Sequence, residues 1–302
     1  MAPLFSRVAV LGTGLIGGSF ALAARRALPG AQEIVRFVGW DKPPVLERAL
    51  ELGVVDEACA ELPKAVAGAD LIYIALPVGL AIESLAEIAR HVAEHALVTD
   101  ACSTKRAICA AAEKHFSQAI RFLGGHPMAG SEVSGIDGAD ASLFQGAKYA
   151  LVAGSGDDAS GEEMARIQHS DARIANFVRL IEAIGARPIW IDAATHDRAA
   201  AFVSHLPQLV SIALAGVTRE ATDQTGLPLT LAGRGLRDAL RLAGSPYSVW
   251  RDIVLTNTDN LDVALDRLSQ AIEHLRAHLR QRELEEEFSA ANDVYKLLHN
   301  LR

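Results

Sequence analysis

The chain has 302 residues, a length typical of two domains. Half of its residues are hydrophobic and 22% are charged, which excludes a disordered or collagen-like protein. The formal net charge of −8 argues against nucleic acid or an anionic membrane surface as the main partner. Three cysteines without a CxxC pair are typical of reduced thiols in a cytoplasmic protein.

The apolar run that follows Arg7 raises the question of a signal peptide. Its interior has instead the pattern of a short buried strand, a glycine turn and an apolar helix, so we interpret it as mature protein. No run of 18 uninterrupted apolar residues follows in the chain, and we expect no membrane span.

Up to about residue 190, short apolar runs alternate with segments of helical periodicity. The runs are nearly continuous in apolar residues, as in parallel strands that are buried on both faces. This alternation predicts an α/β fold with a Rossmann-like, doubly wound, mostly parallel sheet. Strands are expected at residues 7–11, 34–40, 71–76, 97–100, 121–124, 149–153 and 187–191, helices at 15–28, 45–52 and 80–91, and an exposed loop at 154–161.

After residue 191 the strand patterns disappear, and apolar residues recur at three- and four-residue spacing through 199–221 and 261–279. We therefore predict a dinucleotide-binding domain over residues 1–191 and an all-helical domain over 192–302. One apolar stripe of this second half is either an ordinary core face or the shared face of a dimer. The stripe consists of Leu261, Leu265, Leu268, Ile272, Leu275 and Leu279, and the acidic run 283–287 beyond it is predicted to be a solvated helix face.

The motif Gly12-x-Gly14-x-x-Gly17 stands where the first predicted strand meets the first helix. Gly12 permits a tight turn, Gly14 lets a diphosphate approach the backbone, and Gly17 allows close packing of helix and strand. The helix N-terminus favours the negative charge of the phosphates. The cofactor-binding residues predicted in this turn are Gly12, Gly14, Leu15, Ile16 and Gly17.

Asp41 ends the second predicted strand, 24 residues beyond Gly17, where a carboxylate can accept hydrogen bonds from both ribose hydroxyls. The same charge would repel a 2′-phosphate, so NAD is the predicted cofactor rather than NADP. Lys42 follows directly and would soften that rejection. The alternative is that Asp41 only forms a turn.

Two more strand ends are expected at the same crevice, because open α/β sheets bind ligands at the carboxyl ends of their strands. Leu76 ends one of these strands and Pro77 follows it, and both are predicted to contact the cofactor. Ser103 and Lys105 follow the other. Ser103 is either a functional hydroxyl at this crevice or only the cap of the next helix.

His126 follows a predicted strand within the sequence GGHPMAGSE. A neutral imidazole is well suited to remove a hydroxyl proton at neutral pH, and hydride transfer from a carbinol carbon needs such a base. The flanking glycines and the proline fix the backbone around it. His126 is therefore the predicted catalytic base, against the alternative of a structural histidine.

The helical half carries a second group of histidines. His196, Asp197 and His205 lack the spacing of a metal site, and hydride transfer requires no metal, so we predict none. His205 is either a buried histidine with satisfied hydrogen bonds or part of a pocket. Pro207 is expected to interrupt the helix beside it.

Arg237 and Arg241 stand four residues apart and are expected to share a helix face. Such a pair suggests a carboxylate ligand, because a guanidinium matches a carboxylate with two hydrogen bonds. The alternative is pairing with Asp238 or Asp252 at the surface. Trp250 is a core residue, an interface anchor or a pocket wall.

Together, five segments resemble the prephenate dehydrogenase family, which includes arogenate and cyclohexadienyl dehydrogenases. The similarity runs from about Arg7 to Asp252. The segments are GTGLIGGS, DACSTK, GGHPMAGSE, SHLPQ and GLRDALRLAGSP with the tryptophan that follows. The resemblance implies a Rossmann-like domain, a helical domain for substrate binding and homodimerisation, and NAD-dependent oxidative decarboxylation of prephenate to 4-hydroxyphenylpyruvate in tyrosine biosynthesis, in the cytoplasm.

The resemblance also implies roles for individual residues. His126 would take the ring hydroxyl proton, Ser103 would orient that histidine, and Arg241 would bind the ring carboxylate. Further residues are implied as neighbours of the substrate or as acidic groups that organise the pocket. These are Arg237, Ser204, His205 and Trp250 for the first group and Glu132, Asp238 and Asp197 for the second.

One position departs from the family pattern. Gln208 stands where many prephenate-using members carry a second histidine that contacts the substrate side chain. Glutamine can donate and accept hydrogen bonds but cannot become cationic. Prephenate is favoured, with arogenate or dual use as the alternative. Any feedback inhibition by tyrosine would act at the active site, since the two halves leave no chain for a regulatory module.

Two other functions compete with this one. A related dehydrogenase of hydroxy acids or imines would be expected to carry a catalytic lysine or tyrosine on a C-terminal helix. An NAD-responsive binding module would show no turnover, so absorbance of reduced nicotinamide after mixing with prephenate or arogenate distinguishes it from an enzyme.

Overall fold

A computed structural model describes residues 4–27, 35–117, 120–131, 133–153, 171–280 and 284–300. Glu132, Glu283 and the loop predicted at 154–161 lie outside the described residues. Contacts between Cα atoms divide the chain into two compact units, Met1–Asn257 and Thr258–Arg302. This division falls after residue 257 and does not test the predicted domain boundary near residue 192, which stays a prediction.

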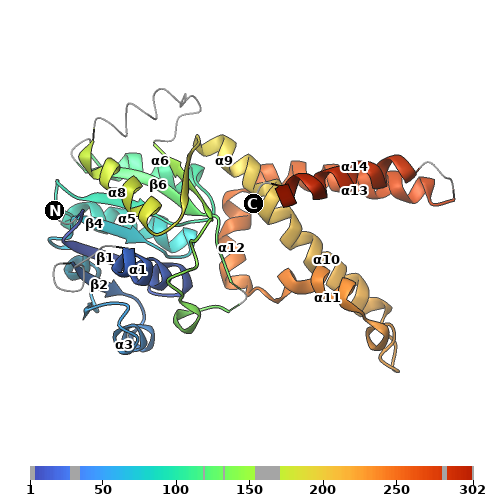
Figure 1. Cartoon of the computed structure of the whole chain (residues 1–302), viewed down its shortest axis with the longest axis horizontal. Coiled ribbons are helices and arrows are strands. Elements are labelled where there is room, and N and C mark those ends of the chain that lie inside the picture. The colour runs from blue at the N-terminus through green and yellow to red at the C-terminus, as the bar shows by residue number, and fades with distance from the viewer. Residues whose placement is uncertain are drawn as a thin grey trace. The chain divides into compact units, whose positions relative to one another are not determined.

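The larger unit is built on one sheet of eight strands in the order β3-β2-β1-β4-β5-β6-β7-β8 (Figure 1). All neighbours are parallel except β6 and β7, which are antiparallel. The sheet confirms the doubly wound, mostly parallel fold. The strands are β1 (Arg7–Leu11), β2 (Arg36–Trp40), β3 (Glu57–Ala58), β4 (Leu71–Ile74), β5 (Leu97–Asp100), β6 (Arg121–Pro127), β7 (Lys148–Val152) and β8 (Arg187–Trp190).

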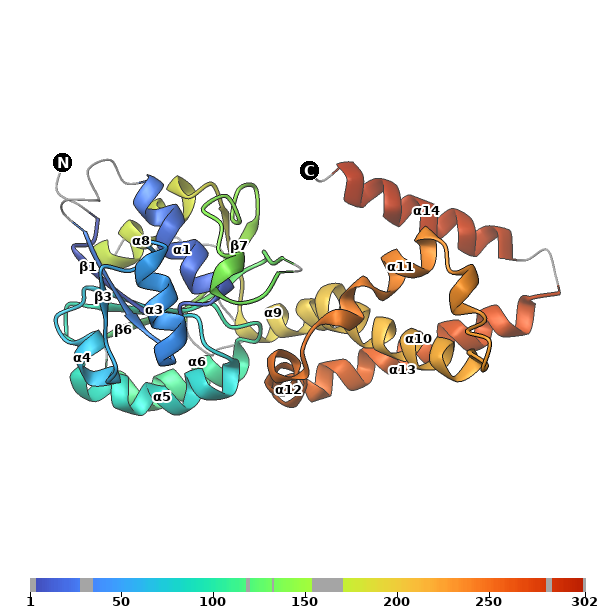
Figure 2. The same cartoon turned by 90° about the horizontal axis from the view of Figure 1, so that it is seen from below.

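Helices cover both faces of this sheet, so its strands are apolar on both sides (Figure 2). On one face, Phe20 of α1 stacks on Tyr73 of β4 and lies beside Phe177 of α8. On the other face, α4, α5 and α6 bury a second apolar cluster against the sheet. The helices are α1 (Leu15–Ala27), α3 (Pro43–Glu51), α4 (Leu62–Val66), α5 (Val78–His91), α6 (Arg106–His115) and α8 (Ala172–Ala183), with a 3-10 turn η1 (Ile136–Gly138).

The largest differences from the predicted strands are at β3 and β6. The two-residue β3 was not predicted, because both of its residues are exposed and show no strand pattern. Strand β6 extends through Pro127, whereas glycine and proline usually end a strand. Gly125 permits the extension, since a Cβ atom there would collide with the carbonyl oxygen of Asp100.

The rest of the larger unit is helical. Helix α9 (Ala193–Ala200) continues through a π-helical turn, η2 (Ala201–His205), into α10 (Leu206–Ala221). The interruption expected at Pro207 takes this form, because proline lacks the N–H that a regular α-helix would use there. The chain continues through η3 (Leu229–Leu231), α11 (Arg234–Leu240), η4 (Arg241–Gly244) and α12 (Tyr247–Thr256).

The smaller unit consists of α13 (Thr258–His278) and α14 (Leu284–Asn300). The predicted apolar stripe lies along α13 and ends just beyond it. Leu261 is buried, but Ile272 and Leu279 are 53% and 69% exposed. On α14, Phe288 is 73% exposed. Apolar side chains this exposed do not form the core face of a single chain. Their exposure favours the alternative prediction, a face shared between two chains of a dimer.

One described helical stretch, Ala193–Ala221, is long and apolar enough by length and composition to cross a membrane. It includes the buried polar residues His196, Asp197, His205 and Gln208. Ionisable side chains at mid-helix are costly in a bilayer, so we attribute its apolar character to packing between protein surfaces.

Candidate active site

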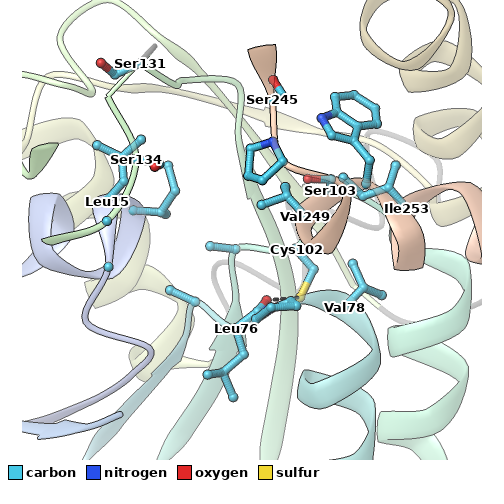
Figure 3. Close-up of a pocket in the computed structure, with 18 of the residues that line it drawn as sticks. Leu15, Leu76, Val78, Cys102, Ser103, Ser131, Ser134, Ser245, Val249 and Ile253 are labelled. Carbon is cyan, nitrogen blue, oxygen red and sulfur yellow. Dashed lines mark hydrogen bonds between the residues drawn. The ribbon is translucent and has the colours of Figure 1, made fainter. Parts of the chain in front are cut away.

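A pocket of about 580 Å³ lies at the carboxyl ends of β1, β4 and β5. The strand order reverses between β1 and β4, and ligands of doubly wound sheets bind at such a switch point. Figure 3 shows Leu15 and Ser134 on one side, Val249 and Ile253 on the other, and Cys102 at the base. The lining is Gly14–Ile16, Ala75–Val78, Ala101–Ser103, Ser131, Ser134, Gly135, Arg241, Leu242, Gly244–Pro246, Val249, Trp250 and Ile253.

The glycine turn fits a diphosphate. Gly12 has a φ of 89°, and a Cβ atom there would collide with the carbonyl oxygen of Ala75. A Cβ atom on Gly17 would strike the carbonyl oxygen of Gly12, so the close approach of α1 to β1 requires glycine. At Gly14 nothing lies within 4 Å of the added atom, which leaves open space at the N-terminus of α1.

Asp41 lies beside this turn but outside the pocket lining. Its Oδ2 atom accepts a hydrogen bond of 2.7 Å from the Thr13 amide, and its Oδ1 atom accepts one of 2.7 Å from the Lys42 amide. These bonds fix the carboxylate next to the glycine turn. Asp41 is therefore more than a turn former, since it couples the end of β2 to the loop after β1.

A buried ion pair joins the ends of β5 and β6. Lys105 and Asp100 are both fully buried and form an ion pair, and the Lys105 ammonium also donates to the Gly125 carbonyl at 2.6 Å. Asp100 accepts in turn from the amides of Gly125 and Cys102. Burial would lower the pKa of the Lys105 ammonium, but the charge of Asp100 offsets this and the pKa is raised. Lys105 thus positions the strand that carries His126 rather than lining the pocket.

His126 lies at the end of β6 and is 8% exposed, behind the pocket lining. Its Nδ1 atom is 2.9 Å from Nε2 of His196, whose Nδ1 atom is 2.8 Å from Oδ1 of Asp197. A carboxylate only accepts, so Nδ1 of His196 carries a proton, and with this single proton on the ring its Nε2 atom accepts. Nδ1 of His126 must donate to it, which leaves the Nε2 lone pair of His126 available as a base.

The surroundings keep His126 neutral. Burial, followed by the nearby His196, Lys105 and His205, holds the pKa of its imidazole well below 6.5. The ring is therefore unprotonated at neutral pH and able to accept a proton from a reacting hydroxyl.

Asp197 anchors this chain of side chains to helix α6. Its carboxylate accepts from the amides of Lys105 at 2.7 Å and Arg106 at 2.9 Å. The first amides of α6 are thus bound by Asp197, so Ser103 is not the cap of this helix. Ser103 lines the pocket, and the hydrogen-bond partner of His126 at Nδ1 is His196.

His196 is the residue that sequence reasoning missed. It was considered only as a metal ligand, and within the described residues no three side chains are grouped as a metal site would require. The adjacent His196-Asp197 pair is the pattern that could have identified it, because a carboxylate commonly fixes the tautomer of a histidine.

The helical side of the pocket contains some of the predicted substrate residues but not all. Arg241, at the start of η4, and Trp250 of α12 line the pocket. Ser204 lies in the π-helical turn, and the exposed Arg237 lies on α11; both are outside the lining. Asp252 pairs with Arg251 at 2.7 Å and accepts a hydrogen bond from the Gly79 amide at 3.1 Å.

His205 and Gln208 are buried behind Trp250 and Leu242. The ring of His205 meets Trp250 edge-on at 5.9 Å, and its Nδ1 atom is 3.2 Å from the Asn257 amide. Burial lowers the pKa of His205 to about 4. Gln208 donates to the Leu242 carbonyl at 2.8 Å. Neither side chain lines the pocket.

The chain is similar to known proteins over most of its length. Residues 21–174 match the prephenate dehydrogenase nucleotide-binding domain, and residues 192–291 match the prephenate dehydrogenase dimerization domain. The first match begins after the glycine turn. Prephenate dehydrogenase of Bacillus subtilis is 32% identical over 93% of this chain and 72% of its own length. Cyclohexadienyl dehydrogenase of Zymomonas mobilis is 29% identical over 90% of this chain and 88% of its own length.

Two solved structures share the fold. Prephenate dehydrogenase from Aquifex aeolicus, in complex with hydroxyphenyl propionate and NAD⁺, aligns with a TM-score of 0.80 at 27% identity over 97% of both chains. Arogenate dehydrogenase from Synechocystis aligns with a TM-score of 0.72 at 29% identity, over 97% of this chain and 99% of that one.

Proposed function

The chain belongs to the prephenate dehydrogenase family, and from this premise we propose that it catalyses the NAD-dependent oxidative decarboxylation of prephenate to 4-hydroxyphenylpyruvate in tyrosine biosynthesis. The observation that carries the proposal is the chain from Asp197 through His196 to His126, which ends in a neutral base at the carboxyl edge of the sheet. We infer the substrate from membership in the family, and the geometry of the site supports a base suited to a ring hydroxyl.

The residues of the glycine turn fit a dinucleotide. Gly12 and Gly17 allow the close approach of α1 to the sheet, Gly14 leaves open space at the helix N-terminus, and Asp41 is fixed beside the turn for the ribose. When bound, NAD supplies the hydride acceptor. Leu15, Ile16, Leu76, Pro77 and Ser103 line the same pocket and are proposed as its contacts.

We assign the proton transfer to His126. Its Nε2 lone pair accepts the proton of the substrate hydroxyl, while His196 and Asp197 stabilise the imidazolium that forms. The ring carboxylate leaves as CO₂, and aromatisation makes the reaction irreversible. His126 is only 8% exposed and is not part of the pocket lining, so substrate binding must bring the hydroxyl within reach of the imidazole.

Substrate binding is assigned to the helical side of the pocket. Arg241 would hold the ring carboxylate with two charge-assisted hydrogen bonds, and Trp250 would form an apolar wall. Roles beside the substrate remain proposals from the resemblance for Ser204, His205, Arg237 and Asp238. The resemblance places Gln208 near the substrate side chain as well, but its amide is buried outside the pocket lining. Glu132, the further acidic group, lies outside the described residues.

Arogenate is the second candidate substrate, alone or together with prephenate. The observation that favours it is Gln208, whose amide is buried and donates to the Leu242 carbonyl, so no cation stands at this position to select a keto acid. The match to cyclohexadienyl and arogenate dehydrogenases is consistent with this alternative.

We further propose a homodimer through the helical half, in the cytoplasm. The exposed apolar residues of α13 and α14 support the dimer, because single chains in solution rarely expose such stripes. The match to a dimerization domain supports the same surface.

The test is a four-way assay of prephenate or arogenate against NAD or NADP, followed by absorbance of the reduced nicotinamide. We expect turnover of prephenate with NAD and a much lower rate with NADP, since Asp41 would repel its 2′-phosphate. Turnover with arogenate alone would establish the second candidate. No turnover with any pair would refute both.

A further inference from the structure

Helix α10 has two fully buried residues, and both are polar. Gln208 is 1% exposed and Ser211 is 2% exposed, whereas no apolar side chain of this 16-residue helix is fully buried. They stand three residues apart and therefore on one helix face.

Both side chains bind the same short segment, residues 239–243, which we term the Arg241 turn. Ser211 donates to the Ala239 carbonyl at 2.8 Å and accepts from the Ala243 amide at 3.0 Å. Gln208 donates to the Leu242 carbonyl at 2.8 Å. Three hydrogen bonds thus join α10 to the backbone on both sides of Arg241.

The two short elements that carry the Arg241 turn have no packed face of their own. Helix α11 has only seven residues, and neither α11 nor η4 has a buried side chain. Short helices are marginally stable without a packed face. Arg241 and Leu242 nevertheless line the pocket, so the orientation of this turn sets the direction of a pocket cation.

Packing alone does not explain a glutamine at position 208. Its Oε1 atom is buried and makes no hydrogen bond to any described group. An unsatisfied buried acceptor is unfavourable, and an apolar side chain of the same size would avoid it. The donor at Nε2 is the part of the side chain that the structure uses.

We propose that Gln208 and Ser211 are positioning residues that hold the Arg241 turn and thereby determine affinity for the substrate carboxylate. The inference rests on the proposed function, since the anion that Arg241 binds is taken to be prephenate. Gln208 and Ser211 act through Arg241 and do not contact the substrate.

The experiment compares Ser211→Ala and Gln208→Met with Thr218→Ala. Thr218 lies on the same helix and donates to the Leu214 carbonyl within that helix, so its variant is a matched control. The readouts are amide hydrogen exchange of residues 239–245 and the kinetic constants with prephenate and NAD. Circular dichroism and thermal unfolding establish that each variant folds.

We expect the exchange of residues 239–245 to accelerate about tenfold in Ser211→Ala and Gln208→Met, and KM for prephenate to rise about fivefold. Changes of this size are what the loss of the two hydrogen bonds of Ser211 or the one of Gln208 predicts. The values of kcat and of KM for NAD stay within about twofold, and Thr218→Ala changes neither readout. In an Arg241→Ala background, Ser211→Ala should have no further effect on KM, because positioning residues act only through the group they position.

Unchanged hydrogen exchange in both variants would refute the proposal that Gln208 and Ser211 hold the Arg241 turn. Accelerated exchange with an unchanged KM, or a KM effect that persists in Arg241→Ala, would refute its role in substrate affinity. If the wild-type protein turns over neither substrate, the proposed function fails, and the exchange measurement still decides whether α10 holds the Arg241 turn.

Discussion

The two sides of the pocket are held in place by different forces. On the sheet side, the ends of β1, β4, β5 and β6 are fixed by ladder hydrogen bonds and by apolar clusters on both faces. On the helical side, the segment around Arg241 is exposed and is held by three hydrogen bonds from α10. The structure therefore places the base on a rigid element and the carboxylate-binding cation on a softer one.

This difference has a consequence for kinetics. Changes near the base should lower kcat, because they alter a group that acts only in the transition state. Changes near Arg241 should mainly raise KM, because they alter binding of the ground state and the transition state together.

The largest expected effect is that of His126→Asn. Asparagine cannot accept the proton at neutral pH, so kcat should fall by about 10²–10⁴-fold, the typical contribution of one general base. NAD binding, measured by calorimetry, should stay unchanged. His115→Asn, an exposed histidine on α6, is the control. A near-normal kcat in His126→Asn would remove the base assignment.

Substitution of His196 comes next. In His196→Ala the Nδ1 atom of His126 loses its partner and its tautomer is no longer fixed, so we expect kcat to fall by roughly 10–100-fold. His196→Gln should recover part of the rate, since its carbonyl oxygen can accept from Nδ1.

The pH profile adds a readout that a loss of stability would not move. His196 helps to lower the pKa of His126. Its removal should shift the acid limb of kcat toward higher pH. An unchanged limb together with an unchanged kcat would contradict the role of His196.

For Arg241→Ala we expect KM for prephenate to rise by about 10–100-fold, with a smaller change in kcat. This rise corresponds to the binding free energy of a charge-assisted hydrogen-bonded pair. Arg237→Ala is the companion variant, because this arginine lies on the neighbouring helix but outside the pocket lining. A comparable rise in Arg237→Ala would mean that the carboxylate is shared between the two. An unchanged KM in Arg241→Ala would refute its anchoring role.

The last prediction concerns the stability of the fold and its dependence on pH. Burial lowers the pKa of His126 and lowers that of His205 to about 4. In the unfolded chain both groups protonate near pH 6.5, so the unfolded state binds more protons below that value. The free energy of unfolding should therefore be highest above pH 6.5 and fall as the pH decreases.

The slope should be at most about 1.4 kcal/mol per pH unit for each histidine between about pH 6.5 and pH 4. Urea unfolding at pH 8, 6 and 5 measures it. Hydrogen bonds from Arg173 lower the pKa of Asp171 to about 2. This carboxylate therefore changes the free energy of unfolding only below about pH 4, outside the range measured here. Equal stability at pH 8 and pH 5 would contradict neutral burial of these rings.

Much of the sheet side could be predicted from the sequence. Strands β1 and β5 begin and end at the predicted residues, because continuous apolar runs between turns leave few alternatives. The glycine turn was predicted from the steric need for glycine at Gly12 and Gly17, which holds in the structure. The helical side was less predictable: Arg241 begins a 3-10 turn rather than extending the helix of Arg237, since side-chain bonds from α10 fix that segment.

By itself, the sequence determined the parallel sheet, the turn at its switch point and the histidine at the end of β6, because periodicity and glycine sterics act over a few residues. Only the tertiary structure decided that His196 and Asp197 stand behind His126, and that Gln208 and Ser211 hold the Arg241 turn. His196 lies 70 residues from His126, and Gln208 lies 34 residues from Leu242. Hydrogen bonds across such separations depend on where whole helices pack, which no local pattern encodes.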